Sequence, residues 1–487
     1  MKRIRKTAAA FFAVMSVVFT CFPYRASAYA KEISVIQQDA ESVTLNAACD
    51  SLSAAELSAV MDGNYYSYCY VTNDTRLHFT APSPVKSLYF MFEAPCSWTV
   101  SLPDGSVKQG GENGFLHEFV ALDSGVTGFD MDIPAGSSLT DVYAFSEGQV
   151  PDWVQIWEPP CKRADLMILP THADDEHLWF GGAMPYYAGE LGYDVQVVYL
   201  TDHKKDPHRR HELLNGLWTV GVKNYPVLTD KFTDDIKTKW SLAAAENAFG
   251  RDRVTEFQVE MLRRFAPRVI LAHDINGEYG HGAHRLNAAT LLDALKIYED
   301  PSVYPESYGK YGAKKVQKCY LHLWKENQIV VQWSDKILGR FDGKNSFEVA
   351  VEGYHCHKSQ LRWKNYLLEW GKYDCRKFGL AYTTVGYDTP GLNDLFEHVD
   401  MTDDEPDGEA DGKSDVVTPQ ENPESVNPVS EPLAENGADR LSDLLESKVN
   451  VTLFGKNLSM GDAAFAILAA VVSLAAIVIV ICLKRRE

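Results

Sequence analysis

Residues 161–399 alternate between short apolar runs and longer amphipathic stretches, and this alternation most constrains what the chain can fold into. Repeated strand–helix units of this size predict a Rossmann-like α/β domain, in which a mostly parallel sheet is covered by helices on both faces. The domain lacks a glycine-rich phosphate loop, because Gly181 and Gly182 fall inside a predicted helix. The strands are predicted at Leu166–Leu169, Val195–Leu200, Tyr225–Leu228 and Val269–Ala272, and the helices at Glu176–Leu191, His208–Val220, Arg253–Phe265 and after His281.

The first and last of these predicted strands are each followed by residues that can bind a metal ion or transfer a proton. His172, Asp174 and Asp175 follow the first strand, while His281 and His284 follow the last and share one face of a helix. In open α/β sheets, ligands bind where the carboxyl ends of the strands meet. His172, Asp175 and His284 offer two imidazoles and a carboxylate, which suits zinc with one position open for water. Asp174 could deprotonate that water, and His281 would face the leaving group.

Each part of this pattern also has a simpler explanation. Asp174 or Asp175 could cap the following helix, where acidic residues are favoured. His281 and His284 could be ordinary polar residues at a helix start. Because the two clusters follow two strands of the same predicted sheet, their combination favours a metal site.

Four short motifs resemble those of the LmbE-like, or PIG-L, zinc-dependent de-N-acetylases. They are H-A-D-D-E at 172–176, H-G-A-H at 281–284, R-x-x-E at Arg209 and Glu212, and H-K-S-Q at 357–360. The resemblance covers most of residues 164–399. Ala173 stands where the family usually has proline, a change that loosens a turn but removes no ligand.

The resemblance implies a role for each matched residue. His172, Asp175 and His284 would bind one divalent metal, Zn²⁺ or alternatively Fe²⁺, since the ligand types admit both. Asp174 would be the general base, and His281 would stabilise or protonate the tetrahedral intermediate. Two further residues have open roles: Arg209 would position substrate or the turn, or pair with Glu212, and His357 would contact substrate or orient a ligand.

Residues 31–160 contain short segments rich in Val, Tyr, Phe and Thr, separated by turn residues, which predict an all-β sandwich. Within it, residues 141–157 resemble the closing strand of galactose-binding-like sandwiches. Four aromatic side chains could bind carbohydrate, but we favour a place in the core. These are Tyr65, Tyr66, Tyr68 and Trp98.

The N-terminus has the features of a secretory signal peptide at residues 1–28. Basic residues precede an apolar run from Ala8 to Phe22, and Ala26-Ser27-Ala28 has small residues at cleavage spacing. Seven of the nine cysteines lie outside this peptide and the predicted membrane helix, so at least one is unpaired within the exported part. Export permits disulfides, but their connectivity does not follow from the spacing.

The C-terminal part predicts a stalk and a membrane anchor. Residues 400–460 are acidic, carry much of the formal charge of −20, and favour a disordered linker. The 21 residues from Ala463 to Leu483 carry no charge and are long enough to span a bilayer. The basic tail at 484–487 should stay in the cytoplasm, which leaves the domains outside the cell.

These features together predict a single-pass bacterial surface protein, with an extracellular ectodomain that removes acetyl groups from N-acetylglucosamine-type glycans. The expected partners are that glycan and the membrane; nucleic acid is not expected, because basic stripes with interleaved aromatics are lacking. Two alternatives remain: a zinc amidase acting on a non-sugar amide, and a glycan-binding surface protein whose catalytic domain has decayed.

Overall fold

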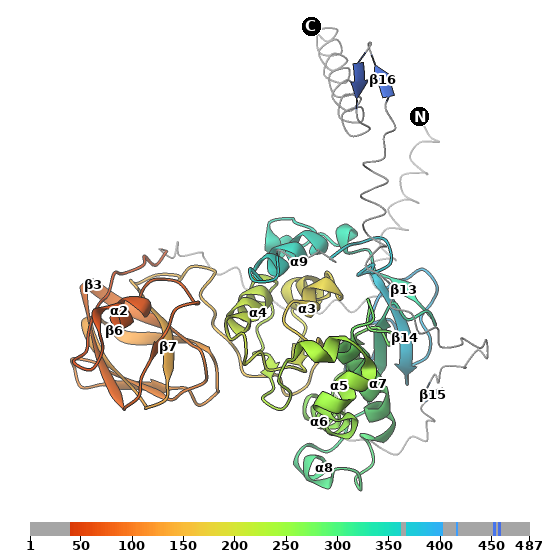
Figure 1. Cartoon of the computed structure of the whole chain (residues 1–487), viewed down its shortest axis with the longest axis horizontal. Coiled ribbons are helices and arrows are strands. Elements are labelled where there is room, and N and C mark those ends of the chain that lie inside the picture. Colours follow the sequence, from red (N-terminus) through yellow and green to blue (C-terminus); the bar gives the residue numbers. More distant parts are fainter. Residues whose placement is uncertain (1–38, 362–366, 403–414, 417–450, 454–455, 459–487) are drawn as a thin grey trace, which may run out of the picture. The chain divides into compact units, whose positions relative to one another are not determined.

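The computed structural model describes residues 39–361, 367–402, 415–416, 451–453 and 456–458 (Figure 1). The predicted signal peptide, membrane helix and basic tail lie outside these residues, as does most of the predicted linker. Within the described ranges, none of the helices combines the length and apolarity needed to traverse a bilayer. The chain divides into two compact units, Met1–Thr418 and Pro419–Glu487. In the second unit, β16 (Val451–Leu453) pairs with β17 (Lys456–Leu458).

An eight-stranded mixed sheet organises the C-terminal part of the first unit, in the order β10-β9-β8-β11-β12-β14-β13 with β15 on β14. The strands from β10 to β12 are parallel, whereas β14 runs antiparallel to β12. The predicted α/β sheet and its four strands are therefore confirmed. The bounds are β8 (Leu166–Leu169), β9 (Val195–Tyr199), β10 (Val227–Leu228), β11 (Val269–Ala272), β12 (Lys318–His322), β13 (Ile329–Val330), β14 (Lys377–Thr383) and β15 (Asp415–Val416).

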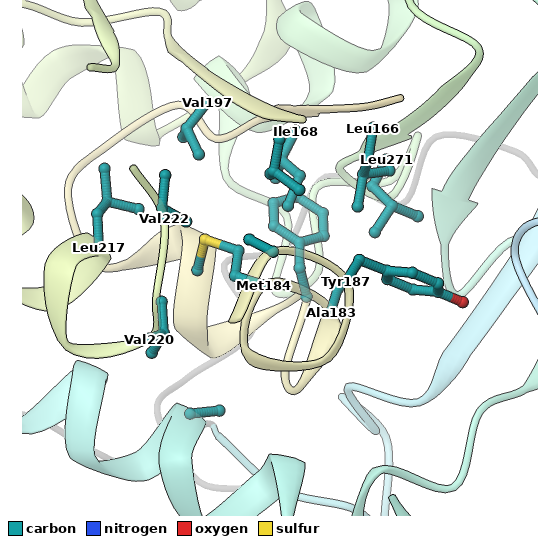
Figure 2. Packing of buried hydrophobic residues seen from close by; sticks show 14 of the residues in the cluster. Leu166, Ile168, Ala183, Met184, Tyr187, Val197, Leu217, Val220, Val222 and Leu271 are labelled. Carbon is teal, nitrogen blue, oxygen red and sulfur yellow. The ribbon is translucent and has the colours of Figure 1, made fainter. Parts of the chain in front are cut away.

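Helices cover both faces of this sheet, because alternate side chains of the buried strands point to opposite sides. Leu166 and Ile168 of β8 pack with α4 and α9 in one core, part of which Figure 2 shows, while Met167 and Leu169 pack with α6 and α7 in another. The helices are α3 (Asp175–Leu178), α4 (His208–Thr219), α5 (Leu242–Phe249), α6 (Arg251–Phe265), α7 (Gly282–Ile297), α8 (Pro305–Tyr311) and α9 (Ser346–His355). The chain also contains a π-helix, η1 (Pro185–Glu190), and short 3₁₀-helices at η2 (Ile236–Lys239), η3 (Trp333–Asp335) and η4 (Gly339–Phe341).

The prediction of one continuous helix over Glu176–Leu191 is wrong, because the helix is interrupted between α3 and η1. Gly181 adopts a φ of 52°, a left-handed conformation that interrupts a helix. A Cβ on Gly181 would lie 2.9 Å from Trp333 Nε1, and one on Gly182 would lie 2.9 Å from the same indole ring. The two glycines therefore let the backbone approach Trp333, a tertiary contact that helical periodicity does not report.

The N-terminal module forms one antiparallel sheet of seven strands, in the order β2-β7-β3-β6-β4-β5 with β1 on β3. The predicted β structure is thus observed, but its predicted division into a sandwich is not confirmed. Tyr65 and Trp98 are buried, whereas Tyr66 and Tyr68 are 48% and 49% exposed. The elements are β1 (Asn46–Ala48), α2 (Ala54–Ala59), β2 (Cys69–Tyr70), β3 (Thr75–Phe92), β4 (Trp98–Ser101), β5 (Val107–Gly110), β6 (His117–Ile133) and β7 (Ser138–Phe145).

Asp141 of β7 makes the stability of this module depend on pH. Its Oδ1 accepts a hydrogen bond from Gly63 N at 3.0 Å, and burial raises its pKa to about 7. Between pH 4 and 7 the folded chain keeps a proton that the unfolded chain has lost, so this residue's contribution to stability falls as the pH rises through that window.

We predict that Asp141→Asn, which cannot ionise, raises the melting temperature at pH 8 and has little effect at pH 4. Thermal unfolding of both proteins across this range tests it. Asp123→Asn, at an exposed residue paired with Lys108, is the control. A melting-temperature difference that does not grow between pH 4 and 7 would contradict the prediction.

Candidate metal centre

The turn between β8 and α3 delivers three polar residues to the carboxyl edge of the sheet. Pro170 and Thr171 end the strand, His172 follows, and Asp175 begins α3. Asp174 stands at the N-cap position with a φ of 104°, a conformation that a non-glycine residue rarely adopts, and its side chain makes no capping hydrogen bond. The helix-cap explanation therefore does not account for Asp174. Such backbone strain is typical of functional sites.

Three ligand atoms from this turn and from α7 form a nearly equilateral triangle. His172 Nδ1 lies 3.1 Å from Asp175 Oδ2, and His284 Nε2 lies 3.3 Å from Asp175 Oδ2 and 3.2 Å from His172 Nδ1. Ligands bound tetrahedrally at about 2.0–2.1 Å from a zinc ion are about 3.3 Å apart. The predicted ligands His172, Asp175 and His284 are thus brought together at the spacing that a metal requires.

In two of the three ligands, Asp175 and His284, the other polar side-chain atom is held by a neighbour. Trp179 Nε1 donates to Asp175 Oδ1 at 2.7 Å, and His284 Nδ1 lies 2.7 Å from Glu278 Oε2. The backbone N–H of His172 donates to Asp175 Oδ2 at 2.8 Å. Such contacts fix the orientation of Asp175 and His284 as metal ligands.

Electrostatics favour a positive charge within the triangle. Burial alone would lower the pKa of His284, but Asp175 and Glu278 outweigh it and raise that pKa to about 10. A divalent cation bound at this position would supply the positive charge in place of that proton.

His273 also lies near Asp175 and His284, but its nitrogens have other partners. Thr171 N donates to His273 Nε2 at 2.9 Å, and His273 Nδ1 lies 3.2 Å from Glu278 Oε1. Because the lone pair of His273 Nε2 already accepts a hydrogen bond, His273 is better suited to support the neighbouring side chains than to bind the metal.

Glu278 is the functional residue that sequence reasoning missed. Its Oε1 accepts from Asp274 N at 3.0 Å and lies 3.2 Å from both His273 Nδ1 and His322 Nδ1, while its Oε2 faces His284. Glu278 precedes His284 by six residues in a loop, and no spacing rule relates the two. Its signal in the sequence was a carboxylate three residues before the H-x-x-H motif.

Arg209 binds the turn that carries the predicted base. Its guanidinium donates to Ala173 O and lies 3.4 Å from Asp174 Oδ1 and 3.7 Å from Asp234 Oδ2. Burial raises the pKa of Asp174 to about 7, although Arg209 lowers it. These contacts favour the turn-positioning role among the alternatives for Arg209.

Glu212, the partner of Arg209 in the R-x-x-E motif, binds two other parts of the chain. It accepts from Tyr66 OH of the N-terminal module at 2.9 Å, and from Ser359 N at 2.7 Å and Ser359 Oγ at 2.6 Å. Glu212 therefore ties α4 to the N-terminal module and to the H-K-S-Q segment.

His281 lies beside the ligand triangle at the start of α7. Its ring stacks on His284 with centroids 4.3 Å apart and meets His172 edge-on at 4.8 Å. Burial lowers its pKa, and His284 and His172 lower it further. The imidazole is consequently neutral at pH 7.

His357 lies behind the turn and is fully buried, with its Nε2 2.7 Å from Glu176 Oε1. This position does not support the predicted substrate contact. It fits the alternative in which His357 helps to orient the site, since Glu176 directly follows the ligand Asp175.

Comparisons with known proteins find similarity to deacetylases over the residues that carry this site. A family profile described as "PIG-L: GlcNAc-PI de-N-acetylase" matches residues 166–295. The 1D-myo-inositol 2-acetamido-2-deoxy-alpha-D-glucopyranoside deacetylase 2 of Saccharopolyspora erythraea is 30% identical over 173 residues, 31% of this chain and 63% of that protein. The 1D-myo-inositol 2-acetamido-2-deoxy-alpha-D-glucopyranoside deacetylase of Streptomyces griseus is 27% identical over 184 residues, which are 33% of this chain and 55% of that protein.

Among solved structures, the N,N'-diacetylchitobiose deacetylase from Pyrococcus horikoshii shares 18% identity, with a TM-score of 0.32, over 43% of this chain and 75% of that one. The chain spans between about half and two thirds of the length of the two curated relatives described above. The family match includes the segments that follow β8 and β11, which contain His172, Asp175 and His284. Residues 166–295 of this chain are a PIG-L family domain.

Proposed function

We propose that this protein is a metal-dependent hydrolase that removes acetyl groups from N-acetylglucosamine-type glycans. The observation that carries the proposal is the triangle of His172, Asp175 and His284, with Asp174 and His281 beside it. A divalent ion held there, Zn²⁺ or Fe²⁺, would polarise the amide carbonyl and make water more acidic.

The surrounding side chains have the properties that amide hydrolysis requires. Asp174 accepts a proton from the attacking water and returns it to the departing amine. Burial, which raises the pKa of this carboxyl, favours its holding the proton between the two steps. Neutral His281 donates an N–H hydrogen bond to the oxyanion of the tetrahedral intermediate. Arg209 holds the turn, and thereby Asp174, in place.

The names of the relatives support this substrate class, because they describe deacetylases of an acetamido sugar. For location, we propose export by residues 1–28, a stalk at 400–460 and a membrane anchor at 463–483, supported by the charge and apolar patterns of those segments. We also propose that residues 31–160 fold as a sandwich. This arrangement favours an extracellular glycan over an intracellular substrate.

We predict acetate release from at least one of three substrates: N-acetylglucosamine oligomers, peptidoglycan or mucin-type glycans. Asp174→Asn should reduce the rate roughly 100- to 10,000-fold, because the general base is removed while the metal ligands stay. EDTA treatment should abolish the activity, and added Zn²⁺ or Fe²⁺ should restore it.

Asp123→Asn is the matched control, since this carboxylate is exposed in the N-terminal module. Acetate release that survives both Asp174→Asn and EDTA would contradict the proposal. A folded, metal-containing protein that releases acetate from none of these glycans would indicate a different amide substrate, whereas a protein that takes up no metal would favour a glycan-binding role.

We further predict that Glu278→Gln weakens metal binding about 10- to 100-fold, the usual effect of losing a residue that orients a ligand. Gln keeps one acceptor oxygen and therefore cannot serve His284, His273 and His322 together. Competition with a zinc-binding dye measures the change. Glu260→Gln, at a surface residue paired with Lys231, is the control, and equal affinities in the two variants would refute the role of Glu278.

A further inference from the structure

A second group of side chains that could bind a metal ion lies next to the turn of residues 172–175, which we call the catalytic turn. This group is separate from the triangle of His172, Asp175 and His284. Glu176 and His177 come from α3, and His357 follows α9. All three side chains have no exposed surface. Their candidate ligand atoms lie within 4.8 Å of one another, so they can meet at one point.

Five polar atoms of this group make no hydrogen bond of suitable geometry among the described residues. They are Glu176 Oε1, both ring nitrogens of His177 and both ring nitrogens of His357. Buried polar atoms almost always have partners, and a cluster without them needs an explanation such as an unseen ion. His357 Nε2 lies 2.7 Å from Glu176 Oε1, and His177 Nε2 lies 3.6 Å from the same oxygen.

A glycine in the middle of α4 lets the two imidazoles pack directly against that helix. A Cβ on Gly216 would lie 2.8 Å from His177 Nε2 and 3.2 Å from His357 Nε2, so a side chain at this position would push both nitrogens out of place. Gly216 therefore permits the arrangement in which the candidate ligand atoms come together.

We infer that Glu176, His177 and His357 form a second divalent metal site, distinct from the ligand triangle. Two imidazoles and one carboxylate suit Zn²⁺. His177 Nε2 and Glu176 Oε1 already have nearly tetrahedral spacing, whereas His357 Nε2 would move from Glu176 Oε1 by about 0.6 Å. The inference does not depend on which amide the enzyme hydrolyses.

The role of this ion is to position the catalytic turn. Glu176 Oε2 accepts a hydrogen bond from Asp174 N at 2.9 Å, so the carboxylate that binds the ion also holds the backbone of the base. Asp174 keeps its positive φ through this contact and through Arg209. The ion would also tie α3 to the segment after α9, because its ligands come from both.

The direct test is the number of zinc ions per chain. The full-length protein is equilibrated with zinc, freed of unbound metal by gel filtration and measured by elemental analysis. We expect two ions in the wild type. We expect one in His177→Leu and in Gly216→Ala, which keeps every ligand but places a methyl group 2.8 Å from His177 Nε2 and so displaces that ligand.

Two matched variants distinguish this site from the ligand triangle. His284→Ala should lose the other ion, and His398→Ala, at a partly exposed histidine, should keep both. Asp174→Asn should also keep both, so the ion count is independent of catalysis and a failure of the proposed deacetylation leaves this test intact.

Anomalous diffraction at the zinc edge needs no variant and should give a peak beside Gly216. One ion per zinc-equilibrated wild-type chain, or a peak only at the ligand triangle, would overturn the inference. So would two ions in folded His177→Leu and Gly216→Ala.

Discussion

The buried carboxylate of Asp175 is the constraint on which the site depends. It has almost no exposed surface, and a charge in such a place is costly unless cations or hydrogen-bond donors surround it. Asp175 meets this need with Trp179 Nε1, the backbone N–H of His172 and the imidazole of His284. The arrangement that stabilises this carboxylate also aligns the atoms that can bind a metal ion.

The buried side chains around Asp175 also need hydrogen-bond or charge partners. His284 is held by Glu278, and Glu278 in turn gathers His273, His322 and the backbone of Asp274. On the other side, Glu176 holds the backbone of Asp174 and faces two further histidines. Buried acids and imidazoles therefore alternate through the interior behind the sheet edge, where the low dielectric makes each pairing strong.

Prediction from the sequence succeeded where short-range pattern determines structure. The apolar runs at Leu166–Leu169 and Val269–Ala272 are β8 and β11, and the motifs that follow them meet. Prediction failed at Glu176–Leu191, where Gly181 and Gly182 approach Trp333, a residue far along the chain. It also missed Glu278 and the burial of His357, since both depend on packing between distant segments.

The sequence by itself determined the residue types of the ligand set and the strands that carry them, because alternating apolar runs and short motifs are local properties of the chain. Only the tertiary structure decided which neighbours hold each ligand, that Arg209 binds the turn rather than Glu212, and that Glu176, His177 and His357 converge. The physical reason is that hydrogen-bond partners and burial arise from contacts between segments far apart in the chain, and residue spacing along the chain contains no record of those contacts.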